Sequence, residues 1–199
     1  MVFFSASSGN MIIGRQSDMN NMSYLKRSMF TAECIALCIV LPLAFHPIQN
    51  AGNIFLPMHI PVLLCGLICG GVFGLLCGLL GPFLSCVITG MPLMALLPGM
   101  MTELAIYGLG AGCMMSLVRT KKLHADLYIS LFVSMLAGRL IGGAARAFIF
   151  LPGNYTIAIW AMGAFVTGLP GAVIQLILLP AIVRVLEKAA LIPERYPKG

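Results

Sequence analysis

The stretch 55–90 reads FLPMHIPVLLCGLICGGVFGLLCGLLGPFLSCVITG and contains no Asp, Glu, Lys or Arg. Glycine recurs in it every four residues, at Gly66, Gly70, Gly74 and Gly78. On a continuous helix this interval would place the glycines on one face, where they let another helix approach closely inside a membrane. The stretch therefore predicts a tightly packed bundle of membrane helices.

The whole chain is strongly apolar. Of its 199 residues 60% are hydrophobic and 9% are charged, and the mean hydropathy is +1.00. Because soluble proteins contain about 25% charged residues, the composition predicts an integral membrane protein with one domain. The net charge of +6 comes from basic residues beside apolar segments, where they orient a membrane protein. No basic cluster alternates with aromatic residues, so we expect no nucleic-acid binding.

Six of the seven cysteines lie in apolar segments: Cys34, Cys38, Cys65, Cys69, Cys77 and Cys86. Two pairs have a spacing of four residues, but no compact cluster of Cys and His supplies four zinc ligands. We therefore expect these cysteines to be small buried apolar residues. The sequence implies neither a metal site nor a cofactor.

The apolar segments and the basic residues together predict the topology. The apolar segments lie at residues 28–45, 58–90, 98–118, 126–151 and 156–183, the last with a kink at Pro170-Gly171. Basic residues gather at 15–27, 119–122 and 184–198, and the positive-inside rule places all three clusters in the cytoplasm. An even number of crossings must therefore separate Arg27 from Arg119. Since segments 28–45 and 98–118 provide two, the stretch 58–90 must cross twice, with a turn near Gly70-Gly71.

The expected fold is thus an all-α integral membrane protein with six transmembrane helices and both termini in the cytoplasm. We expect residues 1–27 to form a cytoplasmic N-terminal tail, or to reflect a misassigned start in place of Met22. Residues 28–188 would form the membrane domain, and residues 189–199 a cytoplasmic C-terminal tail.

Four ionised residues are expected well inside these segments: Glu33, Glu103, Arg139 and Arg146. A charge at the centre of a membrane costs on the order of 3 kcal/mol on insertion scales, so each of them needs a partner or a water-filled cavity. Two interpretations of Arg146 stay open. It forms a structural bridge to Glu103, or it binds an anionic ligand through its fork of donors.

Arg139, Gly142, Gly143 and Arg146 share one helical face because their spacing is i, i+3, i+4, i+7. The glycines leave room there for a ligand or for a neighbouring helix. Arg146 lies within about two turns of the loop at Pro152, and Arg139 lies about 10 Å deeper at 1.5 Å per residue. We therefore expect Arg146 to contact a ligand that enters from outside, and Arg139 mainly to support the bundle.

Polar and aromatic residues are expected together at the outer ends of the helices. Convergent polar groups between aromatic walls are typical of a small-molecule site. The candidate substrate-binding residues are His46, Asn53, His59, Glu103, Tyr107, Arg146 and Trp160.

Several phrases of the sequence carry a family resemblance: FLPMHIPVLLCG, then GLLGPFLS and TGMP. Over residues 29–186 the chain resembles the substrate-binding S component of an energy-coupling-factor (ECF) vitamin transporter. The resemblance implies six helices with both ends inside. It also implies the capture of a vitamin or cofactor precursor at the outer face of the bacterial plasma membrane. The implied partners are a transmembrane coupling subunit and two ATPase subunits, and the protein would be no enzyme by itself.

Ala32 and Ala36 form a small-xxx-small pair that offers a flat face to any helix. In the resembled family an alanine pair of this spacing on the first helix contacts the coupling subunit, and the string AECIA matches it. Glu33 beside the pair would need a polar partner, either in the coupling subunit or in the bundle.

Missing motifs narrow the remaining functions. The chain has no GxxxxGK[ST] and so cannot power transport with its own P-loop, and neither HExxH nor GxSxG suggests an intramembrane hydrolase. The alternative to an S component is a self-contained secondary transporter or channel, with an intramembrane enzyme third. The resemblance allows pantothenate, folate, hydroxymethylpyrimidine, or a cobalamin- or queuosine-like compound as the substrate. The arginines favour a carboxylate such as pantothenate.

Overall fold

The computed structural model describes residues 22–45, 54–150 and 157–196. In these ranges the long elements are helices and no strand occurs, which confirms the all-α prediction. The α-helices are α2 (Tyr24–Phe45), α4 (His59–Cys69), α5 (Gly71–Thr89), α6 (Leu97–Leu117), α7 (Leu123–Ala145), α8 (Ile157–Ala161) and α9 (Leu169–Lys188). Five spans among the described residues are long and apolar enough to cross a membrane, and α4 is a shorter apolar helix.

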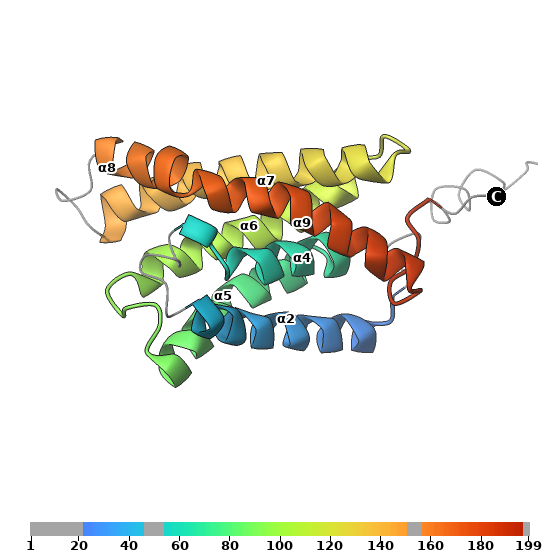
Figure 1. Cartoon of the computed structure of the whole chain (residues 1–199), viewed down its shortest axis with the longest axis horizontal. Helices are drawn as coiled ribbons and strands as arrows, with labels where there is room; N and C mark the ends of the chain where they lie inside the picture. The colour runs from blue at the N-terminus through green and yellow to red at the C-terminus, as the bar shows by residue number, and fades with distance from the viewer. Residues whose placement is uncertain (1–21, 46–53, 151–156, 197–199) are drawn as a thin grey trace, which may run out of the picture.

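The helices run roughly along one axis, and the first described residues lie at the same end as the end of α9 (Figure 1). We call this the basic end. The predicted clusters contribute Lys26 and Arg27, Lys121 and Lys122, and Lys188 at helix termini there. Helix α4 ends at the basic end, because the thiol of Cys69 lies 3.7 Å from the carbonyl oxygen of Arg27. The other end of the bundle is called the opposite end.

The apolar stretch turns back at Gly70, as the count of crossings required. Gly70 has φ 97°, a backbone conformation that residues with a Cβ rarely adopt. Its N–H still donates to the carbonyl oxygen of Gly66 at 3.0 Å, which closes the end of α4. Helix α5 then runs alongside α2 in the same direction, since Tyr24 stacks near Phe73 at one end and Gly81 lies against Cys38 further along.

The turn divides the four-residue glycine repeat between two helices, in agreement with the predicted double crossing of this stretch. Gly66 lies on α4, whereas Gly74 and Gly78 lie on α5. Close approach is nevertheless what the glycines provide. A Cβ on Gly66 or Gly74 would collide with the carbonyl oxygen of Gly108 on α6. The two helices thus reach α6 with their backbones.

Helix α4 forms the centre of the bundle. Its residues from Pro61 to Cys69 are all buried, as expected for a helix that is apolar on every side. It contacts α2, α5, α6, α7 and α9. The described cysteines are free, and five of the six predicted to be buried are buried, whereas Cys86 is half-buried.

The apolar segments 126–151 and 156–183 change from α-helix to π-helix near the opposite end. Helix α7 continues as a π-helix over Arg146–Phe150, and a second π-helix covers Met162–Thr167 before α9 begins. The break lies at Gly168, slightly before the predicted kink at Pro170-Gly171. Pro170 instead occupies the first turn of α9, where its missing N–H costs no helical hydrogen bond.

Candidate functional site

Four of the seven predicted substrate-binding residues come together toward the opposite end of the bundle. We call them the Glu103 cluster: His59, Glu103, Tyr107 and Arg146. They come from the first residue of α4, from one face of α6 and from the end of α7. His46 and Asn53 lie outside the described residues.

An ion pair forms the centre of the Glu103 cluster. Nη2 of Arg146 lies 2.7 Å from Oε2 of Glu103, and the two side chains are 28% and 13% exposed. The hydroxyl of Tyr107 donates to Oε1 of Glu103 at 3.1 Å, which the i, i+4 spacing on α6 allows. The structural bridge that the sequence left open therefore exists. Contact of Arg146 with a ligand stays a prediction.

His59 is the member of the cluster whose polar atoms are not satisfied. Its side chain is 3% exposed, and neither ring nitrogen has a hydrogen-bond partner in the described part of the chain. Nε2 lies 3.9 Å from Oε1 of Glu103, which is too far for a hydrogen bond. A buried polar group without a partner costs about 1–3 kcal/mol. His59 therefore marks a place where a bound group could supply the missing partner.

Arg139 on α7 connects this helix to α6 and α8 next to the Glu103 cluster. Its Nε donates to the Tyr107 hydroxyl at 3.3 Å, and its Nη2 donates to the carbonyl oxygen of Gly168 at 3.1 Å. Its own carbonyl oxygen accepts from Nε1 of Trp160 at 3.1 Å. These contacts support the expectation that Arg139 holds the bundle together. Trp160 thus contacts α7 beside the Glu103 cluster.

Glycines make room for the cluster's side chains. A Cβ on Gly142 would lie 2.9 Å from Cβ of Glu103, and one on Gly99 would lie 2.8 Å from Cγ of Arg146. A Cβ on Gly143 would collide with the indole of Trp160. The space between the two arginines is therefore filled by side chains of neighbouring helices.

Gln175 on α9 is a buried polar residue that was not among the predicted site residues. It is fully buried, and its Nε2 donates at 3.4 Å to the carbonyl oxygen of Leu56, which also accepts from the backbone N–H of His59 at 3.0 Å. Its Oε1 has no hydrogen-bond partner among the described residues. The available signal was an amide side chain in the apolar segment 156–183.

A second buried ion pair, also missed, lies at the basic end. We call it the Asp126 cluster: Thr120, Asp126, Arg195 and Tyr196. Nε of Arg195 donates to Oδ2 of Asp126 at 2.9 Å, and the Tyr196 hydroxyl donates to the same oxygen at 2.6 Å. Oδ1 accepts from the backbone N–H and the hydroxyl of Thr120, at 2.8 and 2.6 Å. From the sequence, Arg195 indicates only the topology, as one of the basic residues at 184–198.

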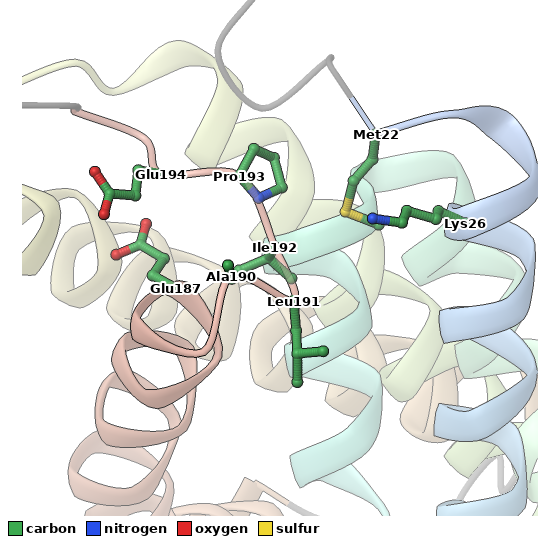
Figure 2. Close-up of a pocket in the computed structure, with 8 residues that line it drawn as sticks. All are labelled: Met22, Lys26, Glu187, Ala190, Leu191, Ile192, Pro193 and Glu194. Atoms are coloured by element: carbon green, nitrogen blue, oxygen red, sulfur yellow. The ribbon is translucent and has the colours of Figure 1, made fainter.

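A pocket of about 410 Å³ also lies at the basic end, between the start of α2 and the segment that follows α9 (Figure 2). Met22 and Lys26 line one side, and Glu187 and Glu194 lie together on the other. None of the predicted substrate-binding residues lines this pocket. It is therefore a feature separate from the Glu103 cluster.

The predicted coupling residues Ala32 and Ala36 are both exposed on α2, and so is Glu33 between them. The buried side of α2 is formed by Thr31, Cys34 and Cys38. The alanine pair therefore faces away from the bundle, where another subunit could reach it. Contact with a coupling subunit stays a prediction.

The described helices are apolar, they enclose ion pairs, and one of them, α4, is buried at the centre of the bundle. Together these features define a multi-pass membrane protein. The chain matches the family of the ECF transporter substrate-specific component over residues 26–183, and it belongs to that family. This membership confirms the resemblance seen in the sequence. Comparisons with curated proteins and with solved structures gave no match.

Proposed function

We propose that the protein is the S component of an ECF transporter that captures a water-soluble vitamin or cofactor precursor for ATP-driven uptake. Its partners are a transmembrane coupling subunit and two ATPase subunits in a bacterial plasma membrane, and it catalyses no reaction itself. Family membership supports the class of transporter. The observation that carries the binding role is His59, which is buried with two unpartnered nitrogens beside the Glu103–Arg146 pair.

The preferred ligand is a carboxylate of the pantothenate type. Arg146 is 28% exposed although it is paired with Glu103, and a guanidinium carries five N–H donors in a fixed fork. Its partly exposed guanidinium would therefore contact a ligand carboxylate beside Glu103. His59 would complete the site with a donor or an acceptor for a second polar group of the ligand. Trp160, and His46 and Asn53 from the first loop, would close it.

The proposed orientation rests on the charges: the basic end would face the cytoplasm, and the Glu103 cluster would lie toward the outer face. Single cysteines in an otherwise cysteine-free chain test this orientation. Val72, which is 68% exposed next to the Gly70 turn, and Lys122 should be labelled only from the cytoplasmic side, and Asn53 and Asn154 only from outside. Labelling of position 72 from outside alone would contradict the assignment.

Purification without added vitamin tests the function itself. Mass spectrometry of the small molecules released from the purified protein should show one vitamin or precursor, with a carboxylate if the preferred ligand class is correct. ATPase subunits and a coupling subunit should co-purify with the chain. Uptake by the chain alone, reconstituted into vesicles without ATPase subunits, would instead establish the secondary transporter.

A further inference from the structure

The outward face of α2 is an unusual surface for a membrane helix. Helix α2 is the least buried of the five long spans. Its exposed residues Met29, Ala32, Glu33, Ala36 and Val40 follow helical spacings of three and four and so share one face. Four of these five residues are apolar, and the fifth is a carboxylate.

Glu33 lies well inside the apolar length of the helix. It is five residues after Ser28, where the apolar segment 28–45 begins, which is about 8 Å at 1.5 Å per residue. None of the ion pairs found among the described residues involves Glu33. The described part of the bundle thus supplies no partner for Glu33. Of the two alternatives that the sequence left open, the coupling subunit remains.

A carboxylate in this position is costly unless something pairs with it. An ionised acidic residue within a membrane helix costs on the order of 3 kcal/mol on insertion scales, and such residues normally face a protein interior. Glu33 faces away from α4, on the opposite side of α2 from Cys34 and Cys38, which are buried. The surface that would cover Glu33 is therefore not part of the described bundle.

We propose that Glu33 pairs inside the membrane with a basic side chain on a helix of the coupling subunit. The pair would select which helix docks on α2. This inference rests on the proposed function, which supplies the coupling subunit. Ala32 and Ala36 let the backbone of that helix approach closely. Its arrival removes lipid and water from around Glu33, and a charge pair is stronger in such surroundings. The occupant is thus a transmembrane helix with Arg or Lys at the depth of Glu33.

Co-purification of the coupling subunit, from cells that express the whole complex, tests the pair. Glu33→Gln keeps the size of the side chain and removes its charge, and should lower the amount of co-purified coupling subunit about tenfold. Glu33→Lys should abolish assembly. Leu140→Gln is the matched control, because Leu140 is 49% exposed on α7 and the change adds the same amide to another outward face. It should assemble like the wild type.

The melting temperature of the isolated protein gives the second measurement. Because Glu33 has no ion pair in the described bundle, Glu33→Gln should melt at the same temperature as the wild type or higher. Wild-type levels of assembly for both Glu33 variants would overturn the inference. So would a fall in melting temperature that parallels the loss of assembly, because it would place Glu33 in the bundle's own packing.

Charge exchange identifies the partner. A cysteine at position 33 in a cysteine-free chain should cross-link to the coupling subunit, and changing the nearest basic residue there to Glu should restore assembly of Glu33→Lys. Cross-linking only to a second copy of this chain would overturn the inference. Failure of the proposed function is distinguishable, because the wild-type chain would then bring down no ATPase subunits at all.

Discussion

The two ends of the bundle each hold an ion pair, and the two pairs are built differently. At the basic end Asp126 is fully buried, and each of its two carboxylate oxygens accepts two hydrogen bonds. Arg195 also donates to the carbonyl oxygens of Met115 and Val118. Toward the opposite end Glu103 pairs with an arginine that is 28% exposed, and the ring nitrogens of His59 beside it lack hydrogen-bond partners among the described residues.

The difference separates a structural network from a candidate binding site. A buried network in which the polar atoms are satisfied rigidifies a protein, and the Asp126 cluster joins the α6–α7 turn to the last described residues of the chain. Unsatisfied polar atoms next to a partly exposed arginine leave bonds for a ligand to make. Variants of each cluster should therefore change different quantities.

The largest expected effect is on stability, at the basic end. Arg195→Gln leaves the carboxylate of Asp126 buried without its cation, which typically costs about 3–5 kcal/mol. The melting temperature of the ligand-free protein in detergent should fall strongly, while ligand affinity should stay near the wild-type value. Lys188→Gln, a change of an exposed basic residue at the same end, is the control. A weak effect of Arg195→Gln would mean that the Asp126 cluster is not structural.

Arg146→Gln should act mainly on the ligand. If Arg146 binds an anionic group, affinity for the compound released from the wild-type protein should fall by about 2–3 kcal/mol, or roughly 30- to 140-fold. Isothermal titration and ligand-free melting measure the two effects separately. If Arg146 only bridges Glu103, stability should fall instead, and the double variant Glu103→Gln/Arg146→Gln should recover it. Unchanged affinity with a large fall in melting temperature would remove Arg146 from the site.

Tyr107→Phe tests the connection between the cluster and Arg139. The change keeps the ring and removes a hydroxyl that donates to Glu103 and accepts from Arg139. Loss of these bonds inside the bundle should cost about 1–2 kcal/mol of stability. Tyr128→Phe, at a tyrosine 47% exposed on α7, should leave the melting temperature unchanged. Equal effects of the two changes would show that the Tyr107 hydroxyl contributes nothing specific.

The smallest effect on stability is expected at His59. His59→Phe replaces unsatisfied polar atoms with an apolar ring of similar shape, which is nearly neutral or stabilising. The ligand-free melting temperature should therefore stay the same or rise, whereas affinity for the released compound should fall. A loss of more than about 1 kcal/mol of stability would indicate that His59 is needed by the fold, which would weaken the contrast between the two clusters.

The apolar pattern and the basic residues predicted much of the fold. The turn at Gly70 followed from the parity of crossings, although no charge marks it, because both flanking helices had to be accommodated between Arg27 and Arg119. The π-helices were not predicted, since their sequences remain as apolar as the α-helices that they adjoin. The four-residue glycine interval by itself did not mark the turn, because it continues from α4 across Gly70 into α5.

The candidate site was predictable only in part. Glu103 and Arg146 stood out because a charged residue inside a membrane span needs a partner, and depth along two antiparallel helices placed them at one level. Tyr107 was predicted as an aromatic wall of the site. The Asp126 cluster did not stand out, because Arg195 is 69 residues from Asp126 and lies after the last apolar segment. Gln175 was not predicted, because an uncharged amide in a membrane span is a weaker indication of a site than a charged side chain.

The shortness of α4 has a consequence for the path of a solute. The helix has 11 residues, or about 16 Å at 1.5 Å per residue, and it ends near the basic end. His59 at its beginning therefore lies close to the middle of a hydrocarbon layer of about 30 Å. Under the proposed function and orientation, a ligand bound beside His59 would already have crossed about half of the hydrocarbon layer from outside. Only the remaining half would then have to open in the ATP-driven step of the proposed transporter.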